Sequence, residues 1–143
     1  MKIVEICIPY PPSVNKIYYN RSNPSIKATG RGLTSEARGY KKYVAELIHY
    51  SLPSIKFGSK DVKVSILSSP PNNRGDNHNG LKIVFDAIEL SGLIDNDKQI
   101  VALEIIPCEI KNPGTWNLKI EPYSIKDRIM DKIRYWNIER KID

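Results

Sequence analysis

Two hydrophobic periods alternate along this chain, and their alternation most constrains the fold that it can adopt. From Asp61 to Leu67, apolar and polar residues alternate one by one, which is the pattern of a half-buried β-strand. From Asn79 to Leu90, apolar residues recur every three or four positions and predict one buried helix face. A chain of 143 residues that mixes such segments suits one compact domain. We therefore expect an α+β fold, namely a small single-domain mixed β-sheet with two main helices plus a C-terminal helix.

Further segments complete this expected fold. A β-branched run predicts a strand over residues 2–9, and Thr34 is a suitable N-cap for a helix that ends near Ser51. A strongly apolar strand is expected over 98–107, and a strand over 115–120 should pair with it in a hairpin.

The C-terminal segment, residues 124–136, has the pattern of a third helix. Ile125, Ile129, Ile133 and Trp136 share one face of it. We expect that face to pack either on the body of the protein or on a second subunit.

The charge of the chain favours a polyanionic partner. Lys and Arg number 22 against 16 Asp and Glu, which gives a formal net charge of +6. Nucleic acid is the first candidate and an acidic membrane surface the second. No apolar run approaches the roughly 20 residues that a membrane-spanning helix needs, and the N-terminus lacks the features of a signal peptide. A cytoplasmic location is expected, where Cys7 and Cys108 should be buried thiols.

Residues 20–33 are polar, basic and contain glycine, without a hydrophobic period. We expect a mobile loop that either faces water or contacts DNA. Its basic residues are Arg21, Lys27 and Arg31.

The densest group of polar residues lies around the expected helix at 79–90. His78, Lys82 and Asp86 are spaced by four residues, so they project from roughly one helix face. Asp76 stands just before this helix, and Asp95 and Asp97 follow it and lead into a strand. If that strand lies beside the start of the helix, Asp76 and Asp97 converge.

Converging carboxylates in a basic protein suggest a cation among them, because they otherwise repel one another. Mg²⁺ suits such a set, since it takes oxygen ligands and keeps waters and phosphate oxygens in its shell. Such a site would support phosphodiester hydrolysis, with Lys82 balancing charge on the phosphate or orienting the attacking water. Each residue also has an ordinary interpretation: Asp76 as a helix cap, Lys82 and Asp86 as a surface ion pair, and Asp95 and Asp97 as turn formers.

The same residues resemble the RusA family of Holliday junction resolvases. That family's pattern is Arg-x-Asp-x-Asp-Asn-x-x-Lys, then Asp-Ala after three residues, then Gly and an acidic cluster that ends in Asp-x-Gln-Ile/Val. The matching residues here are Arg74, Asp76, Asn79, Lys82, Asp86 and Asp97. Pro11-Pro-Ser-Val-Asn15 and Leu33-Thr-Ser-Glu-Ala-Arg38-Gly-Tyr40 match as well, so the resemblance spans about Ile6 to Ile120.

The resemblance implies an Mg²⁺-dependent endonuclease, with Mn²⁺ as a second option, that works as a homodimer and makes paired nicks across a four-way junction. It implies a nuclease domain in residues 1–122, which leaves 123–143 as a C-terminal helical extension. Asp76, Lys82, Asp97 and His78 are the expected catalytic residues. The expected metal ligands are Asp76, His78, Asp97 and Asp95, and Arg74 and Lys82 are expected to contact DNA together with the basic residues of 20–33.

His78 is the departure from the family pattern, because an aspartate belongs at its position. Imidazole favours Mn²⁺ or Zn²⁺ over Mg²⁺ as a ligand. Three interpretations are open: a substitute ligand or a residue that orients a ligand, a general base, or a sign of weakened or lost cleavage. Asn77 or Asp95 are further candidates for the missing ligand, and a two-residue insertion in the alignment would place Asp76 there instead.

Two other functions compete with junction resolution. One is a junction- or single-strand-DNA-binding protein with weakened catalysis, for which His78 argues. The presence of Lys82, Asp76 and Asp97 together argues against it, since binding phosphate gains nothing from added negative charge. The other is a nuclease for flaps or forks, which differs only in the shape of its substrate.

Overall fold

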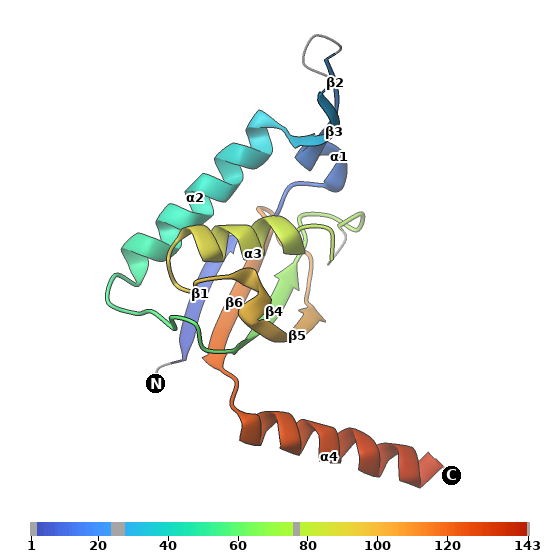
Figure 1. Cartoon of the computed structure of the whole chain (residues 1–143). Helices are drawn as coiled ribbons and strands as arrows, with labels where there is room; N and C mark the ends of the chain where they lie inside the picture. Colours follow the sequence, from blue (N-terminus) through green and yellow to red (C-terminus); the bar gives the residue numbers. More distant parts are fainter. Residues whose placement is uncertain (1–2, 24–27, 76–77, 143) are drawn as a thin grey trace.

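A mixed sheet of four strands forms the centre of the protein in this computed structural model, which describes residues 3–23, 28–75 and 78–142 (Figure 1). The strand order is β1-β6-β4-β5. β6 is antiparallel to both of its neighbours, and β4 and β5 are parallel. The strands are β1 (Val4–Pro9), β4 (Val62–Ser69), β5 (Ile100–Pro107) and β6 (Thr115–Pro122).

Two helices, α2 (Ser35–Ser51) and α3 (Leu81–Leu90), cover one face of this sheet (Figure 1). Thr34 caps α2 as expected, and its hydroxyl accepts a hydrogen bond from the Ala37 N–H at 3.1 Å. Gly92 lies just beyond α3 with φ 84°, a conformation that glycine adopts without strain. The core between helices and sheet includes Val44, Ile48, Val64, Ile66, Val84, Ile88 and Trp116. The expected α+β fold with a mixed sheet is therefore confirmed.

The expectation of a loop over residues 20–33 is wrong. After the short helix α1 (Val14–Ile17), β2 (Tyr18–Asn23) and β3 (Ala28–Leu33) form an antiparallel two-stranded ribbon. Ladder hydrogen bonds join backbone groups, so such a ribbon can form without the apolar alternation that identifies a strand in a sequence. Lys27 lies outside the described residues.

The expected hairpin between residues 98–107 and 115–120 is also wrong. β5 pairs with β4, whereas β6 lies between β1 and β4. The connection from β4 through α3 to β5 makes a parallel β-α-β unit, which places β5 at the edge of the sheet. A 3-10 turn, η1 (Asp97–Gln99), precedes β5.

The face of the sheet away from the helices is open, which corrects the expectation for the cysteines. Cys7 and Cys108 are both exposed free thiols. The apolar run of β5 is likewise largely exposed, because an edge strand buries less of its surface than a central one.

The C-terminal helix, α4 (Ile125–Ile142), extends away from the sheet (Figure 1). The Tyr123 hydroxyl donates to Asp131 at 2.6 Å, and the Arg128 guanidinium lies 3.3 Å from an Asp61 oxygen. Ile125 and Ile129 are 78% and 52% exposed, so this part of the apolar face does not pack on the body. No helix within the described residues is both long and apolar enough to cross a membrane.

Candidate active site

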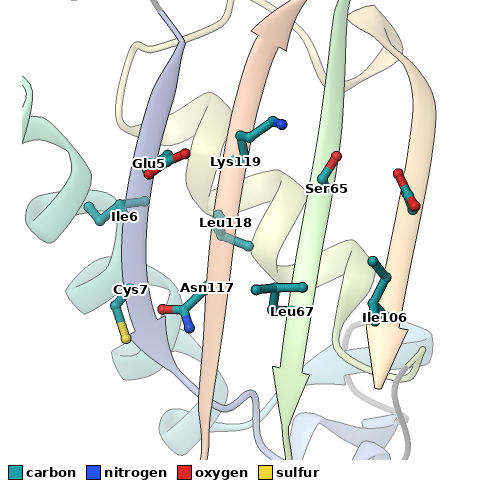
Figure 2. Close-up of a pocket in the computed structure, with 10 residues that line it drawn as sticks. Glu5, Ile6, Cys7, Ser65, Leu67, Ile106, Asn117, Leu118 and Lys119 are labelled. Carbon is teal, nitrogen blue, oxygen red and sulfur yellow. The ribbon is translucent and has the colours of Figure 1, made fainter. Parts of the chain in front are cut away.

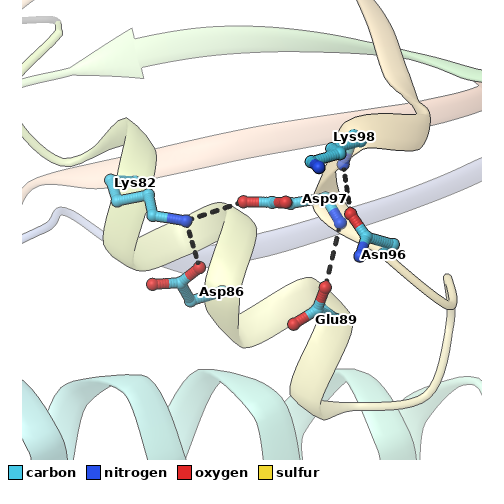
Figure 3. Close-up of polar contacts among 6 residues, drawn as sticks. All are labelled: Lys82, Asp86, Glu89, Asn96, Asp97 and Lys98. Carbon is cyan, nitrogen blue, oxygen red and sulfur yellow. Dashed lines mark hydrogen bonds and ion pairs between the residues drawn. The ribbon is translucent and has the colours of Figure 1, made fainter.

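Lys82 joins two carboxylates that come from different parts of the chain (Figure 3). Its ammonium group donates to Asp86 at 2.9 Å and to Asp97 at 2.7 Å. Lys82 and Asp86 lie one turn apart on α3, and Asp97 is the first residue of η1, which lies beside that helix. The ordinary interpretation of Lys82 and Asp86 as an i, i+4 pair is thus true but incomplete, because a third, distant residue shares the same ammonium group.

The electrostatics of this cluster follow from these contacts. The hydrogen bonds to Asp97 and Asp86 raise the pKa of Lys82 above its usual value of 10.5. The hydrogen bond from Lys82 lowers the pKa of Asp97 below 3.8. Lys82 therefore stays protonated and Asp97 stays ionised across the neutral range. The Lys82 side chain is 63% exposed and that of Asp97 24%, so the cluster is open to a large ligand such as DNA.

Glu89 holds the backbone at Asp97. One of its carboxylate oxygens accepts a hydrogen bond from the Asp97 N–H at 3.0 Å (Figure 3). The side chain of Asn96 caps the same turn by accepting from the Lys98 N–H at 2.9 Å. Sequence reasoning missed Glu89, whose only available signal is that it lies two turns after Lys82 on the same helix.

The structure describes only some of the other predicted site residues. Arg74, His78 and Asp95 are described and exposed, whereas Asp76 lies outside the described residues. Among the described residues, no three His, Cys, Asp or Glu side chains lie close enough together to hold a metal ion. The proposed ligand set of Asp76, His78, Asp95 and Asp97 therefore stays a prediction.

Comparison with known proteins shows the family of this chain. A family model described as "Endodeoxyribonuclease RusA" matches residues 9–121. The crossover junction endodeoxyribonuclease RusA of Enterobacteria phage 82 is 30% identical over 122 residues, which are 84% of this chain and 95% of that protein. The chain belongs to the RusA family. Proteins of the same name from Escherichia coli K12 and Shigella sonnei are each 29% identical over the same shares of the two chains.

Two glycines in the RusA-like segment fit tightly against prolines. A Cβ added to Gly80 would lie 2.2 Å from the Pro11 Cβ, and one added to Gly75 would lie 2.4 Å from the Pro70 Cβ. Both distances are below any real contact, so only glycine fits at either position without a shift of its neighbours. The proline-rich motif at residue 11 thus supports the start of α3, where Lys82 stands.

The described residues of this RusA-family chain fit a divalent metal in part. Asp86 and Asp97 place two carboxylates around one cation, which here is the Lys82 ammonium group. Mg²⁺ is usually held by one or two carboxylates, with waters and substrate phosphates completing its shell. The donor chemistry is therefore suitable, although the pair is shared with Lys82.

A well-formed hollow lies elsewhere, on the open face of the sheet (Figure 2). It measures about 540 Å³ and its lining includes Glu5, Leu67, Ile106 and Lys119. A DNA duplex needs an exposed surface rather than an enclosed cavity, so we assign the site by its side-chain chemistry and not by this hollow.

Proposed function

We propose that this chain is a divalent-metal-dependent endonuclease that resolves Holliday junctions by paired nicks as a homodimer. The observation that carries the proposal is the contact of Lys82 with both Asp86 and Asp97, in a chain of the RusA family. The relatives are named as crossover junction endodeoxyribonucleases, which supports branched DNA as the substrate.

The proposed roles follow from charge and position. Asp97 and Asp76 would hold the metal, with His78 and Asp95 as further candidate ligands. A bound Mg²⁺ would polarise the scissile phosphate and lower the pKa of the attacking water. Lys82 stays protonated, so it can donate to a phosphate oxygen and offset the charge that develops there.

We assign DNA contacts to Arg74 and to the basic residues of the β2–β3 ribbon. Arg74 is exposed in the segment that leads to α3. Arg21 and Arg31 lie on the β2–β3 ribbon, where they occupy neighbouring register positions. A net charge of +6 favours approach to the phosphate backbone of DNA.

The open face of the sheet supports a second copy of this chain as the partner. Leu67 and Ile106 are register partners on β4 and β5 and are 43% and 45% exposed (Figure 2). Glu5 and Lys119, of opposite charge, are register partners on β1 and β6. A second copy related by a two-fold axis beside Leu67 and Ile106 would bury this apolar surface against its own equivalent, as an isologous dimer does.

Cleavage of end-labelled branched DNAs tests the proposal. Four-way junctions, flaps, forks and linear duplexes would be incubated with the protein and Mg²⁺ or Mn²⁺. We expect metal-dependent paired nicks in the four-way junction. Preferred cutting of flaps or forks would support the alternative nuclease, and junction binding without cleavage in either metal would support the weakened-catalysis alternative. The variant His78→Asp, compared in both metals, tests whether His78 replaces a ligand that favours Mg²⁺.

A further inference from the structure

Gln99 is a buried polar residue next to the candidate site, with all the hydrogen bonds that its side-chain amide can form. It is 7% exposed. Its amide oxygen accepts from the Asp95 N–H at 2.8 Å and the Asn96 N–H at 2.7 Å. Its amide nitrogen donates to the Gly58 carbonyl at 2.6 Å and the Lys60 carbonyl at 2.7 Å.

Only an amide side chain of this length satisfies that arrangement. Two acceptors face its nitrogen and two donors face its oxygen, so the position requires both roles at once. A glutamate would place a second oxygen against two carbonyl oxygens, and a methionine would leave all four backbone groups without this partner.

The four bonds join two segments that are distant in sequence. Gly58 and Lys60 precede β4, and Asp95 and Asn96 precede η1 and β5. Backbone contacts connect the same segments, with Asp95 N–H donating to Gly58 at 3.1 Å and Phe57 N–H donating to Leu93 at 2.8 Å. Loss of the Gln99 amide should therefore loosen the turn at 95–97 without separating the two segments.

The turn that Gln99 holds carries Asp97, whose carboxylate lies 2.7 Å from Lys82. At that distance, a shift of under an ångström changes whether the contact forms, and misplacement of a reacting group by about 1 Å can cost about a hundredfold in rate. The position of Asp97 thus depends on a residue whose side chain bonds to backbone groups rather than to Lys82 or Asp86.

We propose that Gln99 is a positioning residue for the cleavage site: its side-chain amide fixes the Asp95–Asp97 turn so that the Asp97 carboxylate meets Lys82 and would be placed to hold the proposed metal. This inference rests on the proposed function, and it adds a residue outside the predicted ligand set.

The test compares Gln99→Met and Gln99→Glu with wild type and with a control that lowers stability elsewhere. Val4→Ala is that control, because Val4 is buried in β1, at the edge of the sheet opposite β5. Three quantities are measured: kcat and KM on a four-way junction, hydrogen exchange of the Asp95 and Asn96 amides, and Mn²⁺ affinity by titration calorimetry.

We expect Gln99→Met to accelerate exchange at the Asn96 amide more than at the Asp95 amide, which keeps its bond to the Gly58 carbonyl. We also expect it to weaken Mn²⁺ binding and to lower kcat by about tenfold to a hundredfold with little change in KM. Val4→Ala should lower the thermal midpoint while leaving kcat and Mn²⁺ affinity unchanged. A wild-type kcat in Gln99→Met despite faster exchange would overturn the inference. An equal loss of kcat in Val4→Ala would also overturn it, because general destabilisation would then explain both.

The two proposals can fail separately. If wild type cuts no branched DNA, the proposed function fails, and Mn²⁺ affinity with amide exchange then decides the role of Gln99. Unchanged Mn²⁺ affinity in both Gln99 variants would overturn the positioning role even in that case.

Discussion

At the scale of single residues, the positive charge of Lys82 offsets two carboxylates that would otherwise repel each other. Asp86 is one helical turn away, and Asp97 comes from a separate segment. Because the ion pairs of Lys82 are exposed, we expect their contribution to the free energy of unfolding to be at most about 1 kcal/mol. Their importance therefore lies in keeping the charged groups together rather than in stabilising the fold.

The free energy of unfolding of Lys82→Met should differ from that of wild type by an amount that changes only at acidic and at alkaline pH. The pKa of Asp97 is lowered, so its contribution is lost only as pH falls below 3.8. The pKa of Lys82 is raised, so its contribution is lost only as pH rises above 10.5. Urea unfolding from about pH 5 to about pH 9 should show a constant difference. A difference that changes near pH 7 would contradict the assigned contacts.

At the scale of elements, the start of α3 depends on close packing against Pro11. We expect Gly80→Ala to destabilise the protein by about 1–3 kcal/mol, because the added methyl group meets the proline ring. The matched control is Gly39→Ala in α2, where nothing lies within 4 Å of the added Cβ. That change should stabilise the helix by about 0.5–1 kcal/mol. Equal effects of the two substitutions in urea unfolding would refute this role of Pro11.

α4 is the element that we place outside the nuclease domain. It lies beyond the family match at 9–121 and is held by contacts at Tyr123 and Arg128. We expect removal of residues 123–143 to leave the thermal midpoint within a few degrees and junction cleavage intact, as the proposed boundary at 122 requires. A truncated chain that fails to fold would show that the boundary is wrong.

The elements also show which parts of the fold a sequence pattern can predict. α2 and α3 are predictable because a helix is specified by local periodicity and capping, as at Thr34. The position of β5 beside β4 was not predictable, because strand pairing depends on distant segments. The β2–β3 ribbon was missed because backbone pairing needs no apolar alternation.

The candidate site follows the same division. The pair of Lys82 and Asp86 is visible in the four-residue spacing, and the meeting of Asp97 with that helix required the fold. The role of Glu89 depends on a hydrogen bond to a backbone group, which leaves no pattern in a sequence. Gln99 stands in the Asp-x-Gln-Ile motif, but its bonds to Gly58 and Lys60 required the fold.

At the scale of the whole molecule, the open face of the sheet is the surface through which we propose that two copies of the chain form a dimer. We expect Leu67→Asp to shift the protein from dimer to monomer in sedimentation equilibrium, because it buries charge against an apolar partner surface. Tyr50→Asp is the control, since Tyr50 is 77% exposed on α2, outside the lining of the sheet-face hollow. A Leu67→Asp protein that remains dimeric would place the interface on another surface.

The central claim is that the cluster of Lys82, Asp86 and Asp97 belongs to the cleavage site. Single-turnover cleavage of a four-way junction by Asp97→Asn tests it most directly. The control is Asp61→Asn, which removes a carboxylate from a surface ion pair with Arg128. We predict that Asp97→Asn lowers the cleavage rate at least about a hundredfold while junction binding in a gel shift is retained, and that Asp61→Asn cleaves like wild type. Wild-type cleavage by Asp97→Asn would contradict the account.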